Sequence, residues 1–303
     1  MVVWQHDTRE EGGPFEFHGD PLVTDSLVIA GSDLRSAGAA AYLYAFDRET
    51  GAVRWKTGVG AGVMTDLPVF DRLLFGVTLG DELIALDRET GKRVWSFASG
   101  ATNESFWMSS SPAVLGERVF FGGLNGVLYA LNARTGQLVW KRELESRVST
   151  GLVANEVGVY AGTSDGRLHL VDRETGEVEA RIEAGSPPTG RLVLAGGRLL
   201  AFLGENTLAC YPGTLAPPLW ARVGEKPWTS SRPYVWGDLA LAGNDLGQVF
   251  AFRLADGTIA WSETIGGTIR GIGAADDGLY VGILTGEVRA RAWPRRIGSP
   301  NAP

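Results

Sequence analysis

The chain has 303 residues, and its 28 Lys and Arg against 35 Asp and Glu give a formal net charge of −7, which argues against a nucleic-acid-binding surface. One cysteine and three scattered histidines exclude an internal disulfide and a clustered structural zinc site. Apolar runs stay well short of the ~18 residues of a membrane span, and 42 glycines indicate many tight turns.

The N-terminal segment MVVWQHDTREEGG has neither the basic start nor the apolar core of an export signal. It therefore predicts a cytoplasmic protein. A natural chain that carries an export signal upstream would instead be periplasmic or belong to the cell envelope.

A repeated pattern runs along most of the chain. A short apolar stretch ends in an acidic or amide residue, and a turn, a glycine and a strand ending in tryptophan follow, as in LYAFDRETGAVRW from Leu43 to Trp55. The equivalent last positions of the six copies are Trp55, Trp95, Trp140, Ala180, Trp220 and Trp261. A period of about 40 residues is typical of a propeller or a solenoid.

Each repeat is predicted to be a four-stranded antiparallel sheet. Apolar residues occupy both alternating faces of segments such as Leu128–Leu131, which favours a buried strand. In the DRETG segments, Asp47 can form an Asx turn and Gly51 can adopt positive φ, as a hairpin loop requires. A further strand precedes each copy and joins it through a glycine-rich turn.

Seven such units can be counted, so the sequence predicts an all-β, seven-bladed β-propeller in one domain, 1–303. The expected blades are 17–57, 61–98, 106–143, 147–183, 187–223, 228–264, and 268–294 together with 1–7. The seventh unit lacks an outer strand, whereas Val2–Trp4 precede the first unit and carry a tryptophan. We expect this N-terminal strand to complete the last blade and to remove an exposed sheet edge.

The recurring tryptophans have a structural interpretation. Each is expected to lie between adjacent sheets, to bury about 200 Å² and to donate its indole N–H to the backbone of the neighbouring unit. Ala180 interrupts the series, so the contact there should be the weakest. The docking residues are Trp4, Trp55, Trp95, Trp140, Trp220 and Trp261.

The run Ala-x-Asp-x-x-x-Gly-x-x-x-Trp, seen as Ala45/Asp47/Gly51/Trp55, resembles the tryptophan-docking repeat of pyrroloquinoline-quinone-type (PQQ-like) β-propellers. The resemblance covers nearly the whole chain. This family includes quinoprotein alcohol dehydrogenases, assembly lipoproteins similar to BamB, and sensor domains that bind no quinone.

The resemblance to the enzymes implies eight blades, a pair of adjacent cysteines over the quinone, and a calcium ion. This chain departs from that pattern, because Cys210 is its only cysteine and its blades number seven. BamB-like proteins also usually have eight blades and an export signal.

The inner end of each blade is the expected functional face, because the innermost strands of a propeller line a central funnel. One interpretation is that its hydroxyls bond to water and backbone. The other is a ligand or peptide funnel in which Arg147 and Arg270 attract an acid while His18 and Asp66 form hydrogen bonds. The candidates are His18, Asp66, Ser110, Arg147, Thr150, Thr189, Ser230 and Arg270.

Three aromatic residues lie outside the docking register: Phe106, Trp107 and Trp228. Exposed aromatic side chains dominate binding hot spots, so one interpretation is that they anchor a partner. The other is that they cover the hydrophobic core.

Two functions remain open from the sequence. The first is a non-enzymatic, monomeric scaffold or sensor that binds a protein or peptide segment through its funnel face, without catalytic residues or a metal. The alternative is a protein that binds pyrroloquinoline quinone with calcium, or another small ligand, and acts as an oxidoreductase.

Overall fold

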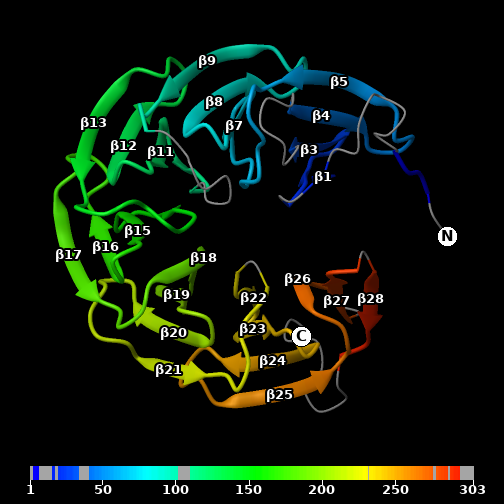
Figure 1. The fold of residues 1–303 in the computed structure, drawn as a ribbon, viewed down its shortest axis with the longest axis vertical. Helices are drawn as coiled ribbons and strands as arrows, with labels where there is room; N and C mark the ends of the chain where they lie inside the picture. Colours follow the sequence, from blue (N-terminus) through cyan, green and yellow to red (C-terminus); the bar gives the residue numbers. More distant parts are fainter. Residues whose placement is uncertain are drawn as a thin grey trace. The chain divides into compact units, whose positions relative to one another are not determined.

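The computed structural model describes residues 3–6, 16–17, 20–33, 41–101, 110–230, 232–275, 278–285 and 287–293. These residues form antiparallel sheets and no helix, and the fold is a seven-bladed β-propeller (Figure 1). The chain forms two compact units, Met1–Ser164 with Val171–Glu177, and Asp165–Leu170 with Val178–Pro303. The single domain expected from the sequence stays a prediction.

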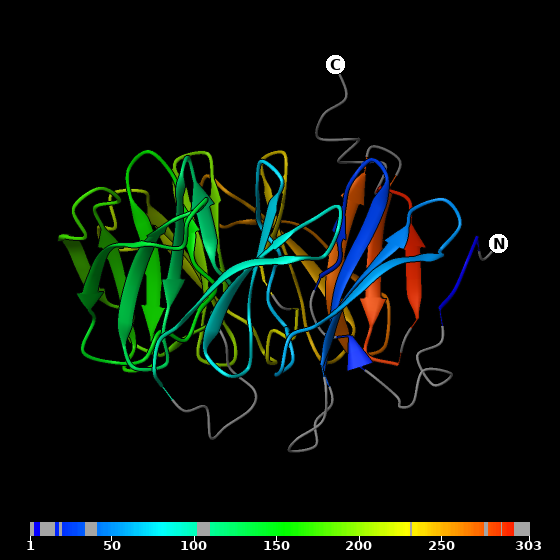
Figure 2. The same ribbon diagram turned by 90° about the horizontal axis from the view of Figure 1, so that it is seen from above.

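The sheets of the first unit follow one another along the chain, and Figure 2 shows their strands side by side. The first sheet contains β3 (Leu27–Asp33), β4 (Tyr42–Asp47) and β5 (Val53–Gly58), with β1 (Glu16–Phe17) and β2 (Leu22–Val23) both paired to β3. The second contains β6 (Val69–Phe70), β7 (Leu73–Val77), β8 (Glu82–Asp87) and β9 (Arg93–Ala98). The third contains β10 (Ala113–Leu115), β11 (Arg118–Gly122), β12 (Val127–Asn132) and β13 (Leu138–Glu143).

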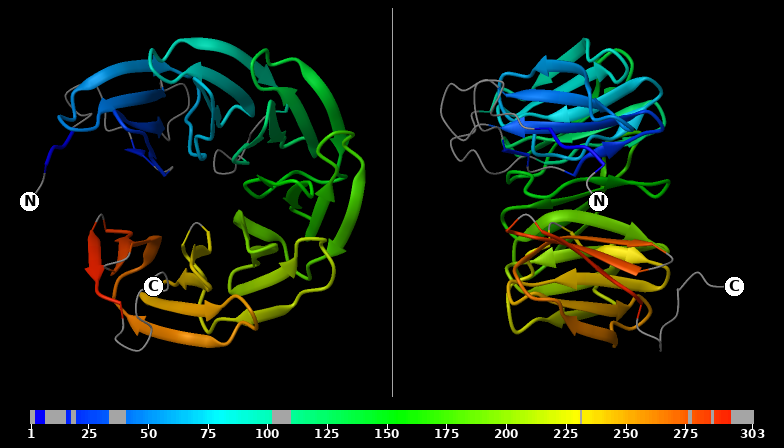
Figure 3. Two further views of the ribbon diagram at one scale, coloured as in Figure 1. Left: turned by 180° about the vertical axis from the view of Figure 1, so that it is seen from behind. Right: turned by 90° about the vertical axis from the view of Figure 1, so that its right-hand side faces the viewer.

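A fourth sheet has the order β14 (Val153–Ala154), β15 (Val159–Thr163), β16 (Arg167–Val171) and β17 (Val178–Glu183). The second unit continues with β18 (Pro188–Ala195), β19 (Arg198–Leu203), β20 (Thr207–Pro212) and β21 (Trp220–Val223). The next sheet contains β22 (Tyr234–Trp236), β23 (Leu239–Gly243), β24 (Gln248–Arg253) and β25 (Ile259–Thr264). The last contains β26 (Ile269–Ala275), β27 (Gly278–Ile283) and β28 (Val288–Arg291), coloured orange to red in Figure 3.

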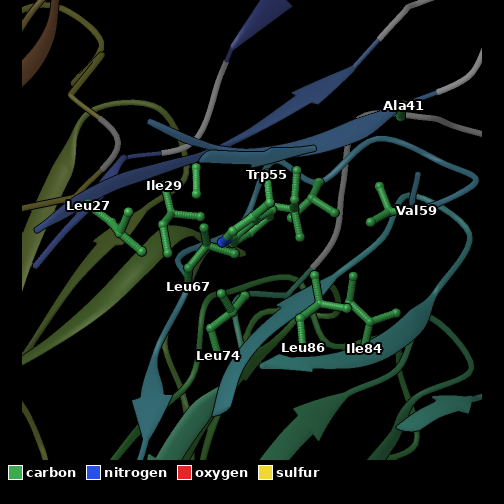
Figure 4. Packing of buried hydrophobic residues seen from close by; sticks show 12 residues of the cluster. Leu27, Ile29, Ala41, Trp55, Val59, Leu67, Leu74, Ile84 and Leu86 are labelled. Atoms are coloured by element: carbon green, nitrogen blue, oxygen red, sulfur yellow. The ribbon is translucent and has the colours of Figure 1, made fainter. Parts of the chain in front are cut away.

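In the second, third and fourth sheets the third strand is buried on both faces, whereas the fourth alternates between exposed and half-buried positions. Strand β4 of the first sheet shares the first pattern, but its neighbour β5 has one buried position, Trp55. A strand that is buried on both faces needs a neighbouring sheet on each side, so the apolar area between sheets supplies most of the stability. Figure 4 shows one such core, in which Trp55 lies among Ile29, Leu74 and Leu86.

The turn between the third and fourth strands has the predicted Asx geometry. Asp47 Oδ1 accepts the backbone N–H groups of Glu49 (3.1 Å) and Thr50 (2.9 Å), and Gly51 has φ +73°. The pKa of Asp47 is lowered, above all by the Thr50 N–H, because this donor favours the ionised carboxylate. The indole ring of the preceding tryptophan, Trp4, packs against this turn glycine.

The expected tryptophan docking is present at five of the six positions, where the indole N–H donates to a backbone carbonyl of the next repeat. The pairs are Trp4 with Arg48 (2.9 Å), Trp55 with Arg88 (2.9 Å), Trp95 with Ala133 (3.0 Å), Trp140 with Arg173 (3.1 Å) and Trp220 with Leu254 (3.0 Å). The sixth, Trp261, packs against a core that includes Leu241 and Val281.

For the N-terminal segment, the expected docking of Trp4 is present, whereas the expected strand pairing is not seen in the described residues. Trp4 docks on Arg48, and its ring lies against Gly51, as the tryptophan of a preceding outer strand would. The last sheet, however, contains three strands in the described part of the chain, and Val3–His6 are not assigned to a strand there. Completion of that sheet by the N-terminus stays a prediction.

Candidate functional site

Three of the seven expected innermost segments are loops, whereas Pro188–Gly190 and Ile269–Gly271 lie in β18 and β26. Met64–Leu67, Val148–Gly151 and Trp228–Ser230 precede their first strands, and each segment is joined to its sheet by one isolated bridge at or beside it. These three segments do not pair as strands because a side-chain hydroxyl, and not a backbone carbonyl, accepts an N–H group of the adjacent strand. A hydroxyl in each segment accepts a backbone N–H of the adjacent strand: Thr65 from Val77 (3.1 Å), Thr150 from Gly162 (2.9 Å) and Ser230 from Gly243 (3.3 Å).

Other hydroxyls connect one repeat to the next. Ser110 donates to the Thr150 carbonyl (2.7 Å), and the Asp66 N–H donates to Ser111 Oγ (3.1 Å). Thr229 donates to the Ile269 carbonyl (2.7 Å). Ser110, Thr150 and Ser230 are at most 6% exposed. These contacts support the structural interpretation of the hydroxyls, because their hydrogen-bonding capacity serves the backbone.

The two arginine candidates lie at the surface. Arg147 and Arg270 are exposed, and they belong to different units, so a joint action on one acid stays a prediction. Thr189 is also exposed and donates to the Gly204 carbonyl (3.3 Å), whereas Asp66 is half-buried. His18, Phe106 and Trp107 lie outside the described residues.

Trp228 is a core residue. It is 9% exposed and packs against Phe202, Phe250 and Phe252, with ring centroids 5.6 to 6.2 Å away. This favours the interpretation that Trp228 covers hydrophobic core over the one in which it is an exposed anchor. Its bridge to Asn244 corresponds to the bridges of Val63 and Val148 in the first unit, so an indole occupies a position that holds valine in those two repeats.

The partner of Trp228 is also enlarged. In the first unit, Gly122 faces Val148 so closely that an added Cβ would lie 2.5 Å from Val148 Cγ1. At the matching register position of the second unit stands Phe202, which stacks on Trp228. Phe202 was not predicted from the sequence, although a register-by-register comparison of the repeats shows Phe in place of Gly.

A cavity of about 340 Å³ lies beside Trp228. Phe250, Phe252 and Ile259 give it apolar walls, and Asn244 and Gln248 contribute side-chain amides. Asn244 Nδ2 donates to Gln248 Oε1 (2.9 Å), which fixes both amides at the start of β24. The cavity combines aromatic surface with a few polar groups, as ligand sites commonly do.

A buried carboxyl group, which the sequence analysis also missed, joins the second and third sheets. Asp81 is 1% exposed and accepts hydrogen bonds from the Ser99 hydroxyl and from the Leu124 N–H (3.0 Å). Burial raises its pKa, although these two donors partly offset the effect. Asp81 has φ +58°, so the tight turn after β7 holds it in the left-handed region.

The residues do not match the quinone-and-calcium site of the enzymes. Cys210 is buried in β20, where burial raises the pKa of its thiol to about 11, and the chain has no second cysteine to form an adjacent pair. Within the described residues, no group of three His, Cys, Asp or Glu side chains is placed to hold a metal ion.

The family model described as outer membrane protein assembly factor BamB matches residues 1–156 and 39–263. The chain belongs to this BamB family. The BamB of Burkholderia pseudomallei is 28% identical over 284 residues, covering 86% of this chain and 68% of the relative. The crystal structure of BamB from Moraxella catarrhalis has the same fold, with a TM-score of 0.75 at 20% identity, covering 91% of this chain and 85% of that one.

A quinoprotein ethanol dehydrogenase of Pseudomonas aeruginosa is 24% identical to this BamB-family chain, over 54% of the chain and 30% of the enzyme. The expected resemblance to BamB-like assembly proteins and to quinoprotein dehydrogenases is therefore confirmed.

The predicted cytoplasmic location is wrong, because the relatives are named as outer membrane assembly factors. The composition of the N-terminal segment was not sufficient evidence for a cytoplasmic location. Among the described residues there is no apolar helix of membrane-spanning length.

Proposed function

We propose that this BamB-family chain is a protein-binding scaffold of the cell envelope that takes part in the assembly of outer membrane proteins. The observation that carries the proposal is the match to assembly factors along most of the chain, from residue 1 to residue 263. The likeness to quinoprotein dehydrogenases, in contrast, covers only 30% and 38% of the length of two such enzymes, although it reaches 80% of this chain in one of them. The absence of nucleic-acid binding and the monomeric state stay predictions.

The structure adds a physical argument. The buried hydroxyls Ser110, Thr150 and Ser230 are occupied by backbone groups, whereas the candidates exposed to a partner are Arg147, Arg270 and Thr189, whose hydroxyl also donates to the Gly204 carbonyl. Exposed cationic and hydroxyl side chains fit recognition of a polypeptide surface better than they fit covalent chemistry.

Site-specific photocrosslinking in the native host tests the proposal. A photoreactive residue is placed at Arg147, Thr189 or Arg270, and a matched control is placed at the exposed turn residue Glu89. We expect adducts with other outer membrane assembly proteins at the first three positions and not at the control. Adducts that are the same at all four positions, or that contain no envelope protein, would contradict the proposal.

The second candidate is quinone binding, which the partial likeness to quinoprotein dehydrogenases favours. Titration of pyrroloquinoline quinone with and without calcium, followed by absorbance and by the thermal unfolding temperature, distinguishes it from the scaffold function. A saturable, calcium-dependent shift would support this second candidate, and no shift would eliminate it.

A further inference from the structure

The cavity beside Trp228 has a local origin in the second unit. At three other contacts between neighbouring repeats a glycine faces a β-branched side chain: Gly31 and Val63, Gly122 and Val148, and Gly243 and Ile269. Between β19 and β23 the pair is Phe202 and Trp228, two rings that need far more room. Of this pair, Trp228 lines the cavity of about 340 Å³.

Gly224 permits this arrangement of the indole. An added Cβ at Gly224 would lie 2.8 Å from Trp228 Cζ2 and 3.1 Å from Cε2, so a larger residue would displace the ring. Gly224 and Trp228 both line the cavity. Because Nε1 is bonded to Cε2, the N–H group lies at the same edge of the indole.

The polar groups of the cavity leave donors for an occupant. Trp228 Nε1 is buried and has no acceptor in the described part of the chain, although the other indoles discussed above, such as Trp220, mostly donate to a carbonyl. Gln248 accepts from Asn244 through Oε1, so its own N–H groups point elsewhere. An occupant that fits this chemistry is apolar and ring-shaped and carries a hydrogen-bond acceptor.

The rim of the cavity indicates that the occupant belongs to a polypeptide. Val223 is 73% exposed and Ile259 is 57% exposed, and both line the cavity. A free small molecule would leave these apolar side chains in water, whereas a chain passing over them would cover them. Val223 also ends β21, the last strand of its sheet, whose outer backbone edge is open to strand pairing in the described residues.

We propose that this cavity binds an aromatic side chain of a partner polypeptide, whose extended backbone runs along β21. Arg222 and Glu225 at the rim of the cavity carry opposite charges. The cavity should therefore select the partner segment by its aromatic ring and not by its net charge. The inference rests on the proposed scaffold function and names the chemistry of the segment that is bound.

Peptide titrations with the purified, ¹⁵N-labelled chain test this inference. The probes are acetyl-Thr-Phe-Thr-amide, its alanine counterpart acetyl-Thr-Ala-Thr-amide, and benzoate as a free ring with an acceptor. The readout is the indole N–H resonance of Trp228, which Trp228→Phe assigns by its disappearance. We expect a saturable shift with the phenylalanine peptide and binding at least about tenfold weaker for the other two probes.

Two variants locate the binding. Ile259→Trp places a large side chain at the mouth of the cavity and is expected to weaken peptide binding at least about tenfold. Leu138→Trp is the matched control, because Leu138 has the same register position in the third sheet and is 47% exposed. It should leave binding unchanged, and circular dichroism confirms that both variants fold.

The inference is overturned if the Trp228 resonance does not move at about 10 mM phenylalanine peptide, if the alanine peptide binds equally well, or if Ile259→Trp has no effect. Benzoate that binds as tightly as the peptide would overturn the polypeptide occupant. The assay needs no assembly machinery, so its failure is distinguishable from a failure of the photocrosslinking that tests the scaffold function.

Discussion

Trp55 and Gly91 are in direct contact across two neighbouring repeats, and the indole of Trp55 fits only because residue 91 has no side chain. An added Cβ at Gly91 would lie 2.6 Å from Trp55 Cδ2, and Gly91 has φ +69°. The Trp55 N–H donates to the Arg88 carbonyl at 2.9 Å in the same turn. The glycine and the tryptophan of the repeat motif therefore form one contact, although they belong to different copies of the motif.

Gly91→Ala should destabilise the chain by two additive causes, the positive φ and the displaced indole. We expect a loss of roughly 2 to 4 kcal/mol in the free energy of unfolding, measured by urea titration. The matched control is Gly100→Ala, because Gly100 has φ +81° and has nothing within 4 Å of an added Cβ. Equal losses for the two variants would show that the tryptophan contact adds nothing.

Trp55→Phe keeps an aromatic ring in the core and removes the indole donor. The Arg88 carbonyl then loses its partner, and we expect a loss of about 1 to 3 kcal/mol by chemical denaturation. Trp261→Phe is the comparison, because Trp261 makes no hydrogen bond through its indole among the described contacts. A loss at Trp261 as large as that at Trp55 would argue against the role of the N–H.

Asp81 should make stability fall as the pH rises. Its pKa in the folded chain is raised above 3.8 by burial, so the folded state binds the proton more tightly than the unfolded state. The free energy of unfolding should therefore decrease, relative to Asp81→Asn, as the pH rises from about 3.8 through the folded pKa, and should stay level above it. Parallel curves for the two proteins would contradict this assignment.

The Asx turns should show the opposite dependence. The pKa of Asp47 is lowered, chiefly by the Thr50 N–H, so its stabilisation is present above about pH 3.8 and is lost as the pH falls through the folded pKa. Asp47→Asn should keep the turn and make this dependence shallower, because Asn132 already accepts the Arg134 and Thr135 N–H groups in the third repeat. The dependence should not vanish, because the pKa values of Asp87, Asp172 and Asp256 are lowered as well. Unfolding measured from pH 2 to pH 6 checks this, and a pH dependence in Asp47→Asn as steep as that of the wild type would contradict it.

The repeats could be predicted from the sequence because their signals are local. Alternating apolar residues specify strands, and the Asp-to-Gly turn specifies the hairpin. The inner segments could not be placed in the same way, because hydroxyls such as Thr65 and Thr150 take backbone donors that a strand would have paired. The same limit applies to Trp228, whose burial depends on Phe202 in the neighbouring sheet.

Outer membrane assembly in the native host tests the scaffold function most directly. The measurement is the amount of folded outer membrane β-barrel, read by its heat-modifiable mobility, in cells with and without the gene for this chain. The account predicts a fall in folded barrels on deletion, which the wild-type gene restores. Barrel levels that stay unchanged without the chain would contradict it.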